Sequence, residues 1–419
     1  MPAKGPDGKQ VMLLGLADAK QISDRPPLVV APAVRELLPL MNGERTLEEI
    51  ASQLGRGLTR TALEPLVAQL DAAGLLEGPT FDAMLARMRA QFDSSSVLPP
   101  GSTAAVADAL VAQALGGSAT EEQKREHGAA RLREAMDGWI GEALKDQAGA
   151  AFATLPLGII APHIDYPRGW VNYAQVWGRM RGVDRPARVV ILGTNHFGSS
   201  TGVCGCDKGF STPLGECRAD TAMVEGLRAR LGERLYEHRY DHEREHSIEL
   251  QAAWIQHCLG ADEQGEYCRV FGALVHDPCM NAGESYDGKG VSLPEFVGAM
   301  REVIAELPGR TLIVGSADLS HVGPAFGDSA PLAGEKGEEH RNKVFAHDQE
   351  MLGLVTRNKA SDLVSAMSWQ GNPTRWCSIG NIVATMEITR AESVQVLHYA
   401  AAMDPQGMTM VSSVAAVLR

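Results

Sequence analysis

The sequence predicts an α/β fold, in which helices flank a central, mostly parallel sheet and a small winged-helix domain comes first. Three short apolar runs, at residues 157–161, 188–192 and 311–315, are each followed within six residues by a histidine. Helical stretches separate these runs, which favours parallel strands whose carboxyl ends share one edge of the sheet. Because ligands bind beyond that edge in open α/β sheets, we expect one site built from distant parts of the chain.

The composition is that of a folded protein with an acidic surface. The 419 residues include 39 Lys and Arg against 52 Asp and Glu, a formal charge of −13, which argues against a nucleic-acid or anionic membrane surface. Residues 1–10 lack the apolar stretch of a secretion signal, and no uninterrupted apolar run reaches the length of a membrane span. The seven cysteines follow no disulfide-like spacing. We therefore expect a reduced, cytoplasmic protein with no nucleic-acid and no membrane partner.

Residues 1–92 are predicted to form a separate winged-helix domain. Apolar spacing indicates helices at residues 34–41, 46–54 and 61–73, followed by a short strand at residues 74–77. Thr46 and Glu49 fit a capping box at the start of the second helix.

The stretch Leu40–Ile50, together with residues 66–76, resembles the PqqD-like family. That resemblance implies a peptide bound along an exposed strand edge, so a peptide substrate is one expected partner. The alternative is a helical packing unit without a ligand. Residues 93–129 are expected to be a linker with helices, and an amphipathic helix at residues 131–144 to lead into the main domain, residues 130–419.

The residues beyond the predicted strands suit a metal ion. His163 and His196 each follow a strand closely, and Cys377 or a carboxylate could be a third ligand. Imidazole and thiolate groups bind zinc, iron and copper, and catalytic sites usually keep three protein ligands and an open position. The alternative for Cys377 is a buried, inert cysteine.

Six motifs in order resemble the Memo family, in the branch of the AmmeMemoRadiSam system protein B, over residues 130–415. They are Ala161–Tyr166, Ile191–His196, Thr212–Gly215, Glu245–Glu249, Gly315–His321 and Arg375–Cys377. The resemblance implies a fold similar to class III extradiol dioxygenases and a radical-SAM protein as a partner. It also implies that His163, His196 and Cys377 bind the metal, with Fe(II) expected first and copper or zinc as alternatives.

By the same resemblance, Glu245, His246, Asp318 and His321 line the pocket, and His246 or His321 would move protons. The chain departs from the family pattern at Asp165, where Gly is more common, and at Ser378, where Gly is usual. Asp165 could bind metal, orient His163 or act as a base. His276 follows a fourth apolar run, at residues 270–275, and is either a pocket residue or a surface turn residue.

Three functions remain open from the sequence. The first is a mononuclear non-heme iron enzyme of oxygenase or oxidase type. The second is a non-catalytic metal-binding or redox partner of a radical-SAM enzyme. The third is a zinc hydrolase, because His242, Glu243 and His246 match the His-Glu-x-x-His pattern of zinc peptidases.

Overall fold

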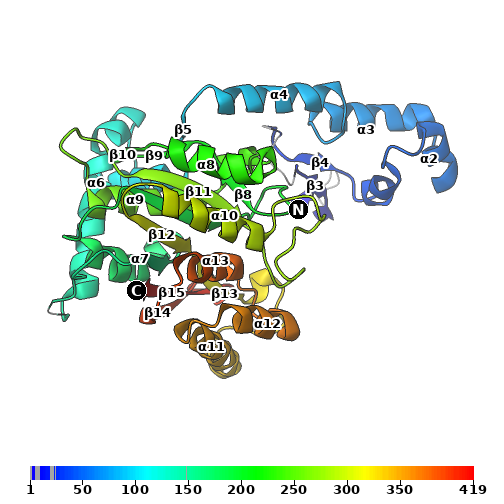
Figure 1. Ribbon diagram of the computed structural model, residues 1–419. Coiled ribbons are helices and arrows are strands. Elements are labelled where there is room, and N and C mark those ends of the chain that lie inside the picture. Colours follow the sequence, from blue (N-terminus) through cyan, green and yellow to red (C-terminus); the bar gives the residue numbers. More distant parts are fainter. Residues whose placement is uncertain (1, 5–9, 19–22, 24, 148) are drawn as a thin grey trace. The chain divides into compact units, whose positions relative to one another are not determined.

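The chain divides into two units, Met1–Ser95 and Ser96–Arg419, in the computed structural model (Figure 1). The structure describes residues 2–4, 10–18, 23, 25–147 and 149–419. Met1 and residues 5–9, which belong to the segment expected to lack a secretion signal, lie outside the described residues.

The first unit contains two antiparallel strand pairs and a run of helices. The strands are β1 (Pro2–Lys4) with β2 (Gln10–Met12) and β3 (Leu14–Leu16) with β4 (Leu28–Val30). The helices are α1 (Val34–Leu37), the 3-10 turn η1 (Leu38–Leu40), α2 (Leu47–Leu54), α3 (Arg60–Ala72) and α4 (Pro79–Asp93). The three predicted helices are present, although the first becomes a 3-10 turn after Leu37. Pro39 explains the change, because its ring nitrogen has no hydrogen to donate to the preceding turn.

Two local predictions in this unit have opposite outcomes. The capping box is confirmed: the Thr46 amide donates to Glu49 Oε2 at 2.8 Å, and the Glu49 amide donates to Thr46 Oγ1 at 3.3 Å. The predicted strand at residues 74–77 is wrong. Gly74 has φ +67° and ends α3, and the Leu75 amide donates back to Leu70 O at 2.9 Å, so the helix end uses the group that a strand would need.

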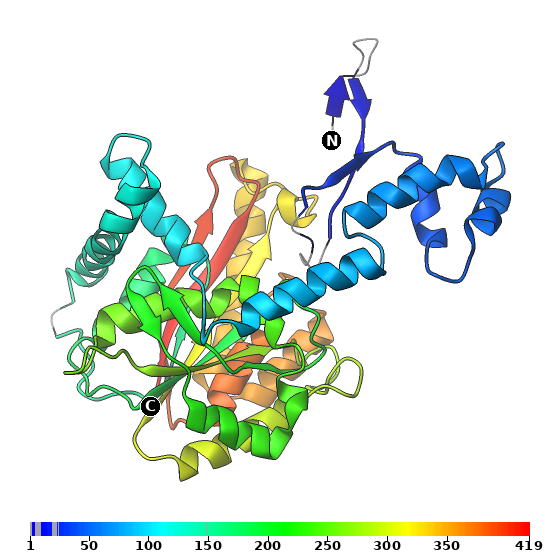
Figure 2. The same cartoon turned by 90° about the horizontal axis from the view of Figure 1, so that it is seen from above.

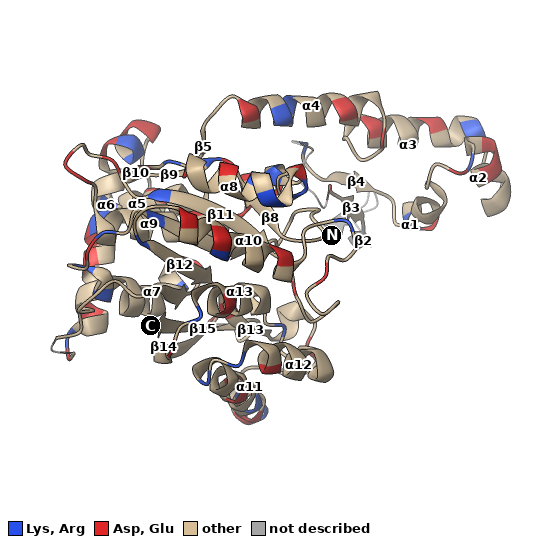
Figure 3. Cartoon of the chain, viewed as in Figure 1, with Lys and Arg blue, Asp and Glu red and all other residues tan. Residues whose placement is uncertain are grey.

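The first unit has its own small core, formed by Leu37, Ile50, Ala51 and Leu63. Figure 3 shows acidic and basic residues interspersed along α2, α3 and α4. The PqqD-like assignment and the absence of a nucleic-acid partner both stay predictions.

The second unit is built on an eight-stranded sheet, which confirms the predicted α/β fold. Its four central strands are parallel: β6 (Gly158–Ala161), β12 (Thr311–Ser316), β7 (Arg188–Thr194) and β11 (Arg269–Val275). Antiparallel strands flank them: β8 (Cys204–Cys206), β13 (Asp318–Val322), β14 (Val394–Met403) and β15 (Met410–Leu418). Figure 2 shows the long β14–β15 pair in red.

Helices cover both faces of this sheet. One face shares a core with α8 (Thr221–Leu231), α10 (Leu293–Glu306), α11 (Gly334–Thr356), α12 (Ala360–Gln370) and α13 (Ile379–Thr389). The other face packs against α7 (Tyr166–Trp177) and α9 (His246–Leu259). Successive residues of a strand face opposite sides of the sheet, and two glycines show this. A side chain at Gly315 would meet α13, and one at Gly193 would meet α9. Within the described residues, no helix combines the length and apolar character that a membrane crossing requires.

Residues 96–129 belong to the second unit. Strand β5 (Val97–Leu98) pairs with β9 (Gly209–Thr212), whose other partner is β10 (Gly215–Cys217). Helix α5 (Ser102–Ala114) packs on α6 (Glu121–Leu144) and on α9. Helix α6 begins ahead of the expected start at residue 131, because Thr120 and Gln123 form a capping box there.

Candidate metal centre

The three expected metal ligands lie together at the carboxyl edge of the sheet. His163 follows β6, His196 follows β7, and Cys377 precedes α13. Their ligand atoms all lie within 4.8 Å of one another, and Cys377 Sγ is 3.4 Å from His163 Nε2. In a tetrahedral site with metal bonds of about 2.0–2.3 Å, neighbouring ligand atoms are roughly 3.3–3.6 Å apart. The two imidazoles and the thiol therefore fit a borderline metal ion.

His163 is fixed by the end of β12 and by Asp318. The His163 amide donates to Asp318 Oδ1 at 3.0 Å, and the ring Nδ1 donates to Ser316 O at 3.1 Å. A carbonyl can only accept, so Nδ1 carries a proton and Nε2 is the nitrogen that faces the site. His163 is 1% exposed, and the buried Asp318 carboxylate lies 3.6 Å from Nε2.

His196 is oriented by a buried carboxylate. Its Nδ1 lies 3.1 Å from both oxygens of Glu245, and its amide donates to Glu245 Oε2 at 2.9 Å. Burial would raise the pKa of Glu245, but the hydrogen bond and charge of His196 lower it to about 2. A carboxylate bound to one nitrogen of a histidine directs the other nitrogen toward a metal.

Cys377 differs from the other cysteines of the chain. Burial would raise its pKa, but the charge of His163 and the hydrogen bonds with His163 and His196 bring the pKa well below the ordinary thiol value. Burial raises the pKa of the Cys206 and Cys258 thiols to about 12. All seven cysteines are free, and Cys377 is the one whose pKa is lowered, which favours the thiolate form that binds metals.

The loop that carries Cys377 is anchored by Asp348, a residue the sequence analysis missed. Asp348 is fully buried in α11, and its carboxylate accepts four hydrogen bonds of 2.5–2.7 Å. The donors are Ser320 Oγ, Trp376 Nε1, Tyr399 Oη and Ser412 Oγ. A signal was present, because Asp348 continues the apolar stripe of Met351, Leu352 and Val355 at helical spacing.

Arg375 joins the same loop to His321. Its Nε donates to His321 O at 2.8 Å and its Nη2 to Asp328 Oδ2 at 2.6 Å, while its own backbone has φ +57°. His321 lies within β13 and its Nδ1 donates to Leu319 O at 2.9 Å, which leaves Nε2 as an acceptor.

A cavity of about 470 Å³ opens beside the ligands. His163, His196, His246, Asp318 and His321 line its polar end. Its apolar wall consists of Ala105, Val106, Ile164, Leu250, Phe326 and Val411. A polar end beside an apolar wall is typical of a small-molecule site.

Helix α5 contributes to this cavity through Ser102, Ala105 and Val106. The buried carboxylate of Glu249 in α9 accepts the amides of Gly101, Ser102 and Thr103 at 2.8–3.0 Å and so anchors the start of α5. No local sequence pattern in residues 93–129 indicated that this segment would line the cavity.

His246 stacks on His196 with ring centroids 4.9 Å apart, and its Nδ1 lies 3.3 Å from Glu245. Burial lowers the pKa of His246 to about 4, so the ring is neutral at pH 7 and can accept a proton. The atoms of His196, Glu245 and His246 form a second group within 4.8 Å.

Asp165 lies at the rim of the cavity. Its Oδ1 accepts the Arg168 amide at 3.1 Å as the N-cap of α7, and its Oδ2 pairs with Arg168 Nε at 2.7 Å. His163 is oriented by Asp318 and Ser316, so Asp165 does not orient it.

Two other histidine interpretations are wrong. His242 belongs to the 3-10 helix η4 (Arg239–Arg244) whereas His246 begins α9, and the His242 Nε2 donates to Cys204 O at 3.0 Å. The two rings are therefore not one turn apart on one helix, as the zinc hydrolase requires. His276 is buried, with Nε2 donating to the carbonyls of Gly283 and Glu284, so it is neither a surface turn residue nor part of the cavity lining.

Fold and site define an α/β protein whose candidate metal centre lies at the carboxyl edge of a mixed sheet. The sequence model of the Memo-like protein family matches residues 125–418, and the chain belongs to this family. This confirms the resemblance stated for residues 130–415.

Three members of the family show the level of sequence identity to this chain. A MEMO1 family protein of Thermus thermophilus is 25% identical over 242 residues, which cover 57% of this chain and 64% of that protein. One of Aquifex aeolicus is 23% identical over 353 residues, 83% of this chain and 80% of that protein. One of Methanopyrus kandleri is 27% identical over 261 residues, 61% of this chain and 79% of that protein.

Proposed function

We propose that the protein is a mononuclear metal enzyme of oxygenase or oxidase type in which His163, His196 and Cys377 bind Fe(II). The observation that carries this proposal is the close approach of one thiol and two oriented imidazoles, whose ligand atoms lie within 4.8 Å of one another, with both imidazoles lining a substrate-sized cavity. Copper and zinc are the alternatives that the same ligands accept.

A bound ferrous ion would supply the one-electron and O₂ chemistry that amino-acid side chains lack. The chain itself provides three ligands, which leaves room for a molecule from the cavity to approach. The apolar wall of the cavity suits a small, largely apolar substrate with a polar group near the lining histidines.

Two histidines that line the cavity can accept or donate protons. His246 is neutral at pH 7 because burial lowers its pKa to about 4. His321 presents Nε2 as an acceptor, because its Nδ1 proton is used by Leu319 O. A substrate hydroxyl could therefore lose its proton to either ring. Asp318 supports this arrangement by fixing His163 through its amide.

The test is metal content after anaerobic purification of the wild type, His163→Ala and Cys377→Ser. Cys279→Ser serves as the matched control, because that cysteine bonds to Val364 O, away from the site. We expect about one iron per chain in the wild type and the control, and little in the two ligand variants. Iron retained in both ligand variants would overturn the proposal.

A second candidate is a non-catalytic metal-binding or redox partner of a radical-SAM enzyme. Exposed apolar side chains favour it: Trp369 is 89% exposed and Met280 74% exposed. Ser368 Oγ donates to Cys279 O at 3.0 Å, so the segments carrying these side chains are adjacent, and such patches often mark protein contacts. Substrate-dependent O₂ uptake that is lost in Cys377→Ser separates the enzyme from the partner protein.

The first unit could supply a peptide substrate, as the PqqD-like resemblance implies. If deletion of residues 1–95 leaves peptide binding and turnover unchanged, this part of the proposal fails.

A further inference from the structure

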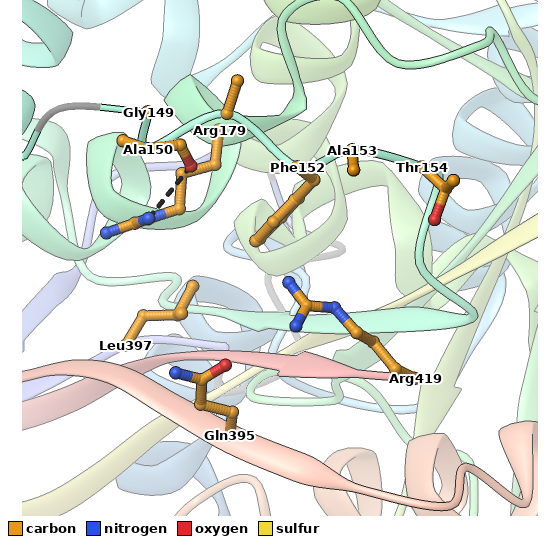
Figure 4. A pocket seen from close by; sticks show the side chains of 10 residues that line it. Gly149, Ala150, Phe152, Ala153, Thr154, Arg179, Gln395, Leu397 and Arg419 are labelled. Carbon is orange, nitrogen blue, oxygen red and sulfur yellow. Dashed lines mark hydrogen bonds between the residues drawn. The ribbon is translucent and has the colours of Figure 1, made fainter.

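A second cavity of about 470 Å³ lies at the opposite end of β6 from His163. Leu418 of β15 pairs with Gly158, the first residue of β6, so Arg419 lies at the amino end of that strand. Figure 4 shows the lining: the loop 149–154, Arg179, Gln395, Leu397 and Arg419. We call this cavity the arginine pocket. The metal centre does not use it.

The arginine pocket contains two guanidinium groups and no acidic side chain in its lining. The Arg419 guanidinium lies over the Phe152 ring, 5.2 Å from its centroid. Arg179 donates to Ala150 O at 3.0 Å and to the side-chain oxygens of Gln147 and Gln175. Among the described residues, neither guanidinium has a carboxylate partner.

Several nearby arginines of the chain, in contrast, have a carboxylate partner. Three arginines that follow Arg179 in sequence each have one: Arg181 with Asp137, Arg185 with Asp262 and Arg188 with Asp220. Burial and the charge of Arg419 both lower the pKa of Arg179, so each of the two cations disfavours the other.

The planar fork of a guanidinium matches the geometry of carboxylate and phosphate oxygens. Thr154 and Gln395 add a hydroxyl and an amide to the lining, while Phe152 and Leu397 add apolar surface. We propose that the arginine pocket binds a small organic anion, with its phosphate or carboxylate group between Arg179 and Arg419 and its apolar part against Phe152 and Leu397. This proposal does not depend on the function of the metal centre.

Calorimetric titration of the full chain with phenyl phosphate, benzoate and inorganic phosphate tests the proposal. We expect one site per chain and tighter binding of an aryl anion than of inorganic phosphate, because only the aryl probes reach the apolar surface. The tighter of phenyl phosphate and benzoate identifies the anionic group. No binding of any probe, or several equal sites, would overturn the proposal.

Arg419→Gln should weaken binding of the tighter probe roughly tenfold or more, since it removes a charge-assisted contact. Arg419→Lys should give an intermediate loss, because the charge remains and the forked geometry is lost. Arg218→Gln is the matched control: this exposed arginine pairs with Glu266, and its loss changes the net charge equally. Equal weakening in Arg218→Gln, or none in Arg419→Gln, would refute the assignment.

Discussion

The two cavities at the ends of β6 differ in how the chain compensates their charges. Beyond the carboxyl end, the carboxylates of Asp318 and Glu245 lie against the two histidines, and the histidines lower the pKa of Cys377. At the amino end, Arg179 and Arg419 contact neutral groups. This difference in charge is why we propose a cation for the first site and an anion for the second.

The largest effect is expected at Asp348. Asp348→Ala removes the acceptor of four donors, three of them in buried hydrogen bonds, and each buried loss costs about 1–3 kcal/mol, so the free energy of unfolding should fall by roughly 3 kcal/mol or more. Urea unfolding measures the change, with exposed Asp362→Ala of α12 as the control. A loss no larger than that of the control would show that the anchor of the Cys377 loop is unimportant.

The next effect concerns His242, which is buried away from both cavities. Burial lowers its pKa to about 4, whereas the unfolded chain binds the proton near pH 6.5. Stability should therefore be full above pH 6.5 and fall by roughly 3 kcal/mol as the pH drops to 4.

His242→Gln should flatten this part of the pH profile of unfolding, and exposed His127→Gln should leave it unchanged. An identical acid slope in wild type and His242→Gln would contradict the expectation.

A smaller effect is expected at Glu245. Glu245→Gln removes the carboxylate that orients His196, and loss of such a partner weakens metal affinity by about 10–100-fold. Competition with a chelator measures the affinity, and Glu243→Gln provides a neighbouring control. Unchanged affinity would mean that His196 is not a ligand or needs no orientation.

The smallest effect should follow Glu249→Gln. The amide keeps an acceptor for the start of α5 but loses the charge, so stability should fall by roughly 1 kcal/mol. Amide hydrogen exchange in α5 should become faster while α13 stays protected. Uniformly faster exchange would argue against a local role for Glu249.

Some parts of the molecule could be predicted from the sequence and others could not. Strand ends place His163 and His196 together by a general property of parallel sheets, so this pair could be predicted from apolar runs alone. Cys377 came from the family resemblance, because nothing in its own neighbourhood distinguishes a ligand from a buried thiol.

Asp348 and α5 were missed because their roles depend on contacts between elements far apart in the chain. The strand expected at residues 74–77 failed for the opposite reason. The apolar residues after Gly74 fit a strand, but the Leu75 amide, which a strand would need, donates to Leu70 O at the end of α3.

X-ray absorption spectroscopy of zinc-loaded protein tests the metal centre most directly. Zinc is a redox-inert probe for the same ligands. The account predicts one sulfur at about 2.3 Å and nitrogens at about 2.0–2.1 Å, with the sulfur lost in Cys377→Ser. A shell of nitrogen and oxygen alone in the wild type, unchanged in Cys377→Ser, would contradict the assignment of Cys377 as a ligand.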